Sequence, residues 1–206
     1  MRESGILMHI TSLPAPYGIG TMGKDAYAFV DFLVRAGQRY WQILPLTPTG
    51  YGDSPYQSLG ACAGNHYLID LDRLADEGLL KKEEIQNIPW GSNPARVDFG
   101  AMYAHRMNVL RQAFQRFTPD GAYETFVEQN RSWLEDYALF TALKDTLGGK
   151  PWLDWPEALR LRKADALAEK RRELSDEIRL QYFVQYEFDR QWKLSLIHIS
   201  EPTRQE

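Results

Sequence analysis

The first part of the chain alternates between short apolar runs and one amphipathic segment. Residues 5–10 and 39–46 are apolar runs that end at turn residues, which predicts two short buried strands. Between them, a helix is predicted over residues 24–36, with Gly37 as its expected C-terminal cap. Its apolar face comprises Ala26, Phe29, Val30 and Leu33. Strand, helix and strand at this spacing predict a βαβ unit whose two strands are parallel.

Beyond Leu71 the apolar residues recur at helical spacing along most of the chain, and two aromatic-rich stripes are predicted to be buried. The first comprises Tyr103, Met107, Leu110, Phe114 and Phe117, and the second comprises Phe126, Trp133, Tyr137 and Phe140. A stiff aromatic turn at residues 152–156 is predicted to pack against these helices. A single last helix is predicted over residues 163–193, and its apolar side comprises Leu174, Ile178, Tyr182, Tyr186 and Trp192.

Aromatic and hydrogen-bonding residues gather in the loop that follows the second predicted strand. They are Tyr51, Asp53, Ser54, Tyr56 and Gln57, and prolines within residues 45–55 stiffen the segment. Flat apolar faces flanked by polar groups suit a sugar, whose ring has C–H faces and a rim of hydroxyls. In a βαβ unit, ligands meet the loops after the strands, here residues 11–20 and 47–65. A proline-rich turn without a binding role is the alternative.

Charge and composition exclude several classes of partner. The 206 residues carry a net charge of −4 with acids and bases interspersed, so no basic stripe indicates nucleic acid or an anionic membrane. Cys62 is the single cysteine, which excludes an internal disulfide and favours a reducing compartment. Small-core packing is favoured for its thiol over a nucleophilic role. The apolar run near the N-terminus is too short for a signal peptide or membrane span, so we expect a cytoplasmic protein.

Several motifs, in one order along the chain, carry a family resemblance. They lie at residues 5–20 (GILMHITSLPAPYGIG), 40–57 (YWQILPLTPTGYGDSPYQ), 64–70 (GNHYLID), 133–140 (WLEDYALF) and 152–156 (WLDWP). The chain resembles the 4-α-glucanotransferases, or amylomaltases, of glycoside hydrolase family 77 over nearly all residues up to about 192. Several long motifs in one register make this signal more specific than a single short pattern.

The resemblance implies an α/β fold that begins a (β/α)8 barrel. Residues 1–70 would supply the first two strands and the substrate loop, and residues 71–162 a mainly helical insertion after the second strand. Residues 163–193 would lead towards the third strand. A barrel of this kind needs eight strands and about 250 residues. The barrel is therefore expected to be incomplete in this chain.

The resemblance also implies the chemistry and the substrate. The family transfers α-1,4-glucan segments between malto-oligosaccharides by retaining double displacement, using a nucleophilic Asp and an acid/base Glu on later barrel strands. Those motifs are absent here, so no catalytic residue is assigned, and the chain alone is expected to be inactive. Tyr56 matches the family's loop tyrosine beside the substrate, flanked by Ser54, Asp53 and Gln57. Ser54 and Asp53 also suit turn capping. Tyr51, with Tyr103, is a candidate second glucan contact, although Tyr103 also fits the buried stripe.

The remaining candidate residues favour structural roles. His9 lies at the end of the first predicted strand and is interpreted as a hydrogen-bonded structural histidine in preference to a substrate contact. Asp70 and Asp72 are interpreted as a turn acid and an exposed acid in preference to a catalytic pair. Neither zinc-ligand spacing nor a phosphate-cradling glycine loop occurs, so no metal and no nucleotide cofactor are predicted.

Residues 194–206 depart from the family pattern and resemble a translated sequencing adapter. We expect them to be an artefact, so His198 receives no role; the alternative is a short strand over residues 196–199. Two strands without the rest of a barrel leave an unpaired edge, which predicts non-specific self-association. Two other functions remain open: a non-catalytic glucan-binding module, and a helical interaction domain over residues 97–193.

Overall fold

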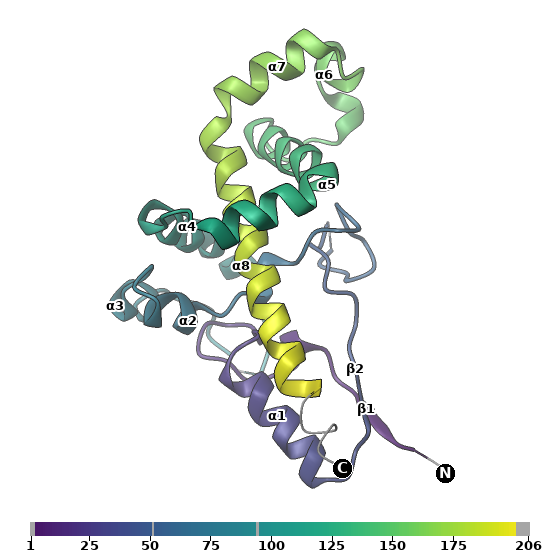
Figure 1. The fold of residues 1–206 in the computed structure, drawn as a ribbon, viewed down its shortest axis with the longest axis vertical. Coiled ribbons are helices and arrows are strands. Elements are labelled where there is room, and N and C mark those ends of the chain that lie inside the picture. Colours follow the sequence, from purple (N-terminus) through teal and green to yellow (C-terminus); the bar gives the residue numbers. More distant parts are fainter. Residues whose placement is uncertain (1–2, 51, 94, 201–206) are drawn as a thin grey trace. The chain divides into compact units, whose positions relative to one another are not determined.

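The computed structural model describes residues 3–50, 52–93 and 95–200, with side chains through Leu194 (Figure 1). It divides into two compact units. The first takes the described residues up to Thr118 and again from Glu187, and the second comprises Pro119–Tyr186. In the described residues no helix is long and apolar enough to cross a membrane.

The first unit begins with the βαβ arrangement. Strand β1 (Gly5–Leu7) pairs in parallel with β2 (Tyr40–Gln42), and α1 (Lys24–Arg35) connects them. The backbone N–H of Gln38 bonds to the carbonyl of Leu33 at 2.9 Å, and Gly37 has a φ of +66°. This is the glycine-terminated helix end that the sequence predicts. The predicted βαβ unit and the parallel direction of its two strands are therefore confirmed.

Both strands are shorter and less buried than predicted. After β1 the chain turns into a short 3-10 helix, η1 (Ile10–Ser12), and β2 ends before Pro45. Leu7 and Tyr40 are 57% and 59% exposed, so the prediction of buried strands was wrong for these residues. The reason is that the described residues form a two-stranded sheet, on which the Phe29 ring of α1 contacts Trp41. The barrel, including the place of these two strands in it, stays a prediction.

The chain beyond Leu71 is mainly helical, as predicted, and a short 3-10 helix precedes it. In the first unit the elements are η2 (His66–Leu68), α2 (Leu71–Asp76), α3 (Lys82–Gln86) and α4 (Phe99–Arg116). In the second they are α5 (Gly121–Thr146), η3 (Trp152–Asp154), α6 (Glu157–Arg160) and α7 (Ala164–Glu173). The last helix, α8 (Ser175–Ser200), begins in the second unit and ends in the first.

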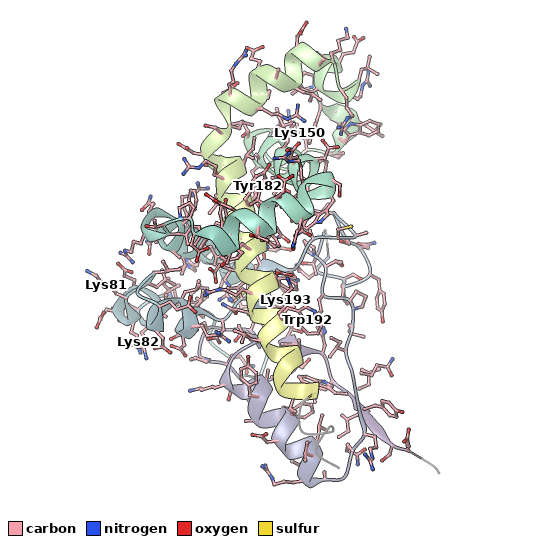
Figure 2. The ribbon with its side chains drawn as sticks, in the orientation of Figure 1. Lys81, Lys82, Lys150, Tyr182, Trp192 and Lys193 are labelled. Carbon is pink, nitrogen blue, oxygen red and sulfur yellow. The ribbon has the colours of Figure 1, made fainter. Side chains whose placement is uncertain are left out.

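The core of the first unit lies between the two strands' loops and the end of α8. Ile10, Met22 and Leu68 form a buried cluster, and Trp192 packs against it, whereas Lys193 is exposed (Figure 2). The chain after β1 passes very close to itself here. A Cβ on Gly20 would lie 1.9 Å from the carbonyl oxygen of Ile10, so only glycine fits. Close packing therefore fixes the path of residues 10–22.

Helix α4 buries a different stripe from the one predicted. Its buried residues are Met102, Arg106, Val109, Leu110 and Ala113. Tyr103 is 57% exposed, so its assignment to a buried stripe was wrong. The buried face is centred on Arg106, whose side chain is completely buried and bonds to backbone carbonyls. A pattern of apolar residues does not predict that an arginine is buried. The face that the sequence predicted therefore differs from the observed buried face of α4.

The second unit packs around α5. Leu139, Leu143, Trp155, Leu159, Leu167 and Leu174 belong to its buried core. Phe140 stacks on Trp155 with ring centroids 5.4 Å apart, which confirms that the aromatic turn packs on a helix. Trp152 is 49% exposed and takes no part in that core. Of the predicted α5 stripe, Phe126 is buried and the other three aromatics are half-buried.

The single helix predicted over residues 163–193 is broken at Leu174, where α7 ends and α8 begins (Figure 1). Leu174 leaves helical geometry with φ −102° and ψ 22° and places its side chain in the core of the second unit. Ser175, Asp176 and Glu177 then suit a helix start. The backbone is helical through Ser200, so the alternative strand over residues 196–199 is not formed. The side chain of His198 lies outside the described ones, and the artefactual origin of the tail stays a prediction.

Candidate functional site

Residues 49–58 form a small closed loop. Thr49 and Ser58 pair as an antiparallel bridge, and the N–H of Gly50 bonds to the carbonyl of Gln57 at 2.8 Å. Inside the loop, the N–H of Asp53 bonds to Gly50 at 3.2 Å, and that of Gln57 bonds to Ser54 at 3.1 Å. Two consecutive turns therefore hold the segment that the sequence singled out.

Within the loop, Tyr56 and Gln57 are the described candidate site residues that face solvent. The Tyr56 side chain is 73% exposed, the largest exposure among the large apolar and aromatic side chains described. The Ser54 hydroxyl accepts a hydrogen bond from the N–H of Tyr56 at 3.3 Å, so it does cap the turn. Tyr51 lies outside the described residues. The loop thus offers an aromatic face and an amide on a hydrogen-bonded base.

Asp53 is held by α4. It adopts a left-handed backbone conformation with a φ of +56°, and its carboxylate accepts a hydrogen bond from the Tyr103 hydroxyl. Burial, and then this bond, raise the pKa of Tyr103 to about 12, so the phenol keeps its proton at neutral pH. The structure therefore brings Asp53 and Tyr103 together. The carboxylate acts as an anchor of the loop, the structural role that the sequence left open.

The segment after the loop is fixed by a residue that sequence reasoning missed. The guanidinium of Arg106 donates to the carbonyl of Tyr67 at 2.8 Å and to that of Ile69. Burial lowers the pKa of Arg106 to about 10, which leaves it charged at neutral pH. Burial also lowers the pKa of His66 to about 3, with a contribution from Arg106. One sequence signal could have indicated this residue: Arg106 is a basic residue at helical spacing with the apolar residues between 102 and 113.

Asp70 and Asp72 have structural partners. Asp70 is buried; its carboxylate accepts from the Thr21 hydroxyl at 2.6 Å and from the N–H of Arg73 at 3.0 Å, capping α2. Asp72 accepts from the Tyr17 hydroxyl at 2.6 Å and is half-buried, so its assignment as an exposed acid was wrong. Burial, and then this bond, raise the pKa of Tyr17. These contacts explain both acids without catalysis.

His9 and Cys62 differ from expectation. The Nδ1 atom of His9 is buried without a hydrogen-bond partner in the described part of the chain, so the expected hydrogen-bonded histidine is not observed at this atom. Burial lowers the pKa of its ring. Cys62 is exposed, which corrects the assignment to a small core, because it lies in the open loop after Ser58. Within residues 3–200, excluding those not described, no cluster of three or more His, Cys, Asp or Glu residues suits a metal.

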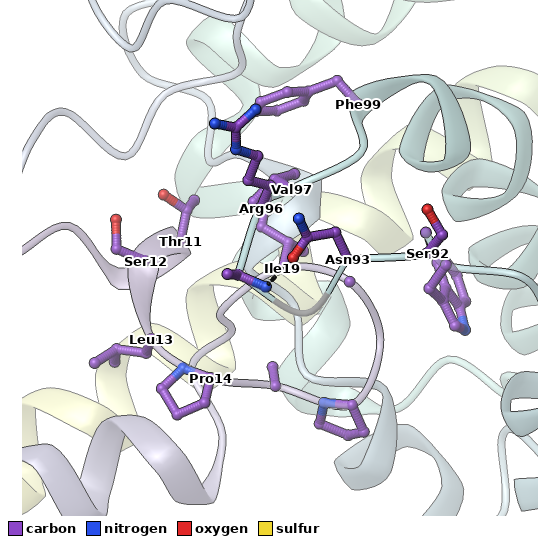
Figure 3. A pocket seen from close by; sticks show the side chains of 16 residues that line it. Thr11, Ser12, Leu13, Pro14, Ile19, Ser92, Asn93, Arg96, Val97 and Phe99 are labelled. Carbon is purple, nitrogen blue, oxygen red and sulfur yellow. Dashed lines mark hydrogen bonds between the residues drawn. The ribbon is translucent and has the colours of Figure 1, made fainter.

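A pocket of about 570 Å³ opens between residues 11–19, which follow β1, and residues 90–93 and 95–99, which precede and begin α4 (Figure 3). Aromatic lining comes from Trp90 and Phe99, and polar lining from Thr11, Ser12, Ser92, Asn93 and Arg96. The first segment was expected at a ligand-binding edge. The second was not, because residues 90–99 show no strand or helix periodicity and only the fold brings them beside the first.

A sequence model of the 4-alpha-glucanotransferase family matches residues 8–198 of the chain. The chain belongs to this family. It is 48% identical over 195 residues to a 4-alpha-glucanotransferase of Streptococcus pneumoniae, and 49% identical over 197 residues to that of Thermus thermophilus. Each alignment covers 93% of this chain and 39% or 38% of the relative. The chain thus spans about two fifths of the length of these curated relatives.

The fold is also that of a family member. An amylomaltase from Streptococcus agalactiae, solved in complex with acarbose, superposes with a TM-score of 0.93 at 44% identity. The match covers 98% of this chain and 41% of that one. The predicted family is therefore confirmed. The mainly helical chain, including its pair of parallel strands, has the fold of part of an amylomaltase.

Proposed function

We propose that the protein to which this chain belongs transfers α-1,4-glucan segments between malto-oligosaccharides, and that residues 49–58 position the glucan. The family match over residues 8–198 carries the proposal. In this assignment β1 and β2 are the first two strands of a (β/α)8 barrel, and the helices that follow are an insertion. The position of the loop after β2 supports it, because barrel enzymes bind ligands beyond the carboxyl ends of their strands.

The proposed roles follow from exposure and hydrogen bonding. Tyr56, exposed on a closed loop, stacks on a sugar ring, and the exposed amide of Gln57 bonds to hydroxyls. Ser54 and Asp53 keep the loop in shape through the N–H of Tyr56 and the hydroxyl of Tyr103. The exposed ring of Tyr103, with Tyr51, provides a second glucan contact. The substrate is a neutral α-1,4-glucan such as a malto-oligosaccharide or amylose.

The reaction requires groups that we do not assign to this chain. Retaining transfer uses two carboxyl groups about 5–5.5 Å apart, one as nucleophile and one as acid and base. Asp53, Asp70 and Asp72 are all engaged by structural partners. We therefore propose that the chain supplies substrate-positioning residues of the whole protein, and that by itself it neither catalyses transfer nor binds glucan saturably.

Activity and binding measurements test this proposal. The purified chain should release no glucose from maltotriose, and reproducible release that scales with protein concentration would contradict the assignment. Titration with maltoheptaose, followed by tryptophan fluorescence, should not saturate. Saturation that Tyr56→Ala abolishes and Tyr56→Phe retains would favour a free-standing glucan-binding module. Cooperative unfolding of residues 97–193 alone would favour a helical interaction domain.

Two further proposals concern the state of the chain. The exposed side chains of Leu7 and Tyr40 on a two-stranded sheet support non-specific self-association, which sedimentation velocity over a concentration series would detect. The exposed single thiol of Cys62 supports a reducing, cytoplasmic location, since an unpaired exposed cysteine is readily oxidised elsewhere.

A further inference from the structure

The pocket between residues 11–19 and 90–99 has walls that are already in place. Its volume of about 570 Å³ lies within the range of small-molecule sites. The N–H of Gly20 bonds to the carbonyl of Thr11 at 3.1 Å and closes the first wall. Gly18 lies so close to Trp90 that an added Cβ would be 2.5 Å from the Trp90 carbonyl oxygen. The Trp90 indole N–H bonds to the carbonyl of Ile85 at 2.8 Å, which fixes the ring.

The polar lining keeps unused hydrogen-bonding capacity. The side chains of Thr11, Ser12 and Ser92 make no hydrogen bond within the part of the chain that the structure describes. Asn93 uses its carbonyl oxygen to accept from the N–H of Ala95 at 2.9 Å, which leaves its amide N–H groups available. Hydroxyl and amide groups around an aromatic wall match the hydroxyl rim and the C–H face of a sugar ring.

The charge of the pocket is positive. Arg96 is the single ionisable side chain that lines it, is exposed, and forms no ion pair among the described residues. The Arg106 guanidinium lies 5.9 Å from the Trp90 ring centroid, and its Nε and one terminal nitrogen have no partner in the described chain. Asp98, next to Gly91 in space, caps α4 through the N–H of Ala101 at 3.0 Å. Asp70 acts on Arg106 in turn, so the positive charge of the pocket lining comes from Arg96.

We propose that this pocket binds a monosaccharide carrying an anionic group, of the sugar phosphate class. Arg96 pairs with the anion, because a guanidinium presents its donors in a fork that matches phosphate oxygens. Thr11, Ser12 and Asn93 bond to the hydroxyls, and the ring lies against Trp90 or Phe99. The ligand differs from the neutral glucan of the proposed function, so the pocket is a second site with its own specificity.

Calorimetric titration of the 206-residue chain with glucose 6-phosphate tests this site. Saturable binding is expected, and Arg96→Gln should weaken it at least tenfold, about the effect of one charge-assisted bond. Arg39→Gln, the same change at an exposed arginine outside the pocket, should leave it unchanged. Thr11→Val should weaken glucose 6-phosphate binding but not inorganic phosphate binding. Circular dichroism of each variant confirms that it is folded.

Three results would overturn the proposal. The first is no saturation by glucose 6-phosphate, or equal affinity in the Arg96→Gln variant. The second is equally tight binding of inorganic phosphate, which would mean an adventitious ion only. The third is displacement of glucose 6-phosphate by maltotriose at equal concentration, which would assign the pocket to the glucan site. Failure of the glucan assignment would leave the glucose 6-phosphate measurement unaffected, so the two failures are distinguishable.

Discussion

Single residues decide which groups the loop between Thr49 and Ser58 offers to solvent. Asp53 could have bound sugar hydroxyls, but its carboxylate accepts the Tyr103 hydroxyl and its backbone is left-handed. Tyr56 makes no side-chain hydrogen bond in the described chain and is widely exposed. The two residues lie close in sequence and differ in environment: Asp53 is anchored by a hydrogen bond, and Tyr56 is exposed.

Removal of the Tyr103 hydroxyl should loosen the loop. In Tyr103→Phe the ring stays but the bond to Asp53 is lost, so hydrogen exchange at the N–H groups of Gly50 and Gln57 should become faster. A charge-assisted bond contributes about 1.5–3 kcal/mol, and exposure reduces this towards about 1 kcal/mol, or several-fold in exchange rate. Tyr56→Phe removes a tyrosine hydroxyl from the loop itself. It should leave the exchange rates of Gly50 and Gln57 unchanged. Equal acceleration in both variants would argue against the anchor.

His66 should make the first unit sensitive to acid. Its folded pKa is lowered to about 3, against an ordinary value of 6.5, so the unfolded chain binds a proton at higher pH than the folded chain. Stability is therefore fully present above about pH 6.5 and falls as the pH decreases towards 3, by up to about 1.4 kcal/mol per pH unit. The lowered pKa of His9 acts in the same direction.

Urea denaturation at pH 7 and pH 5 measures this effect. The wild-type chain should lose free energy of unfolding between the two values, and His66→Phe should lose less because it keeps an aromatic ring beside Tyr67 without a titrating group. A pH dependence that is identical in the variant would show that the pKa of His66 is the same in the folded and the unfolded chain.

At the scale of elements, local pattern and observed structure agree where the pattern is simple. Helix α1 and its Gly37 end are as predicted, because an amphipathic stripe followed by glycine is a local signal. The break at Leu174 escaped prediction, because a leucine at helical spacing fits a continuous helix. The buried face of α4 was predicted wrongly because Arg106 is buried by its hydrogen bond to a carbonyl far away in sequence, which a local pattern does not contain.

Replacement by alanine should change protein stability in opposite directions at two glycines, Gly20 and Gly121. Gly20→Ala would force a Cβ against the backbone oxygen of Ile10, which cannot move aside, and should destabilise the first unit by about 1–3 kcal/mol or more. Gly121→Ala, at the start of α5, meets no atom within 4 Å and should stabilise the second unit by about 0.4–1 kcal/mol. Thermal unfolding followed by circular dichroism separates the two. A neutral Gly20→Ala would contradict the observed packing.

At the scale of the whole molecule, the chain matches one part of the longer proteins in its family. It spans about two fifths of its curated relatives, yet superposes on a solved amylomaltase over 98% of its own length. The sheet within the described residues has two strands, and Leu7 and Tyr40 are exposed on it. The loop around Asp53 is held through α4, within the first unit.

The sequence by itself determined the family, the parallel βαβ unit, the helical character beyond Leu71 and the exposed tyrosine of the loop. Each depends on local periodicity or on ordered motifs, which a single chain displays directly. The tertiary structure decided that Asp53 is an anchor, that Arg106 is buried and that residues 11–19 and 90–99 enclose a pocket. Those features depend on contacts between residues far apart in sequence, and no local pattern contains them.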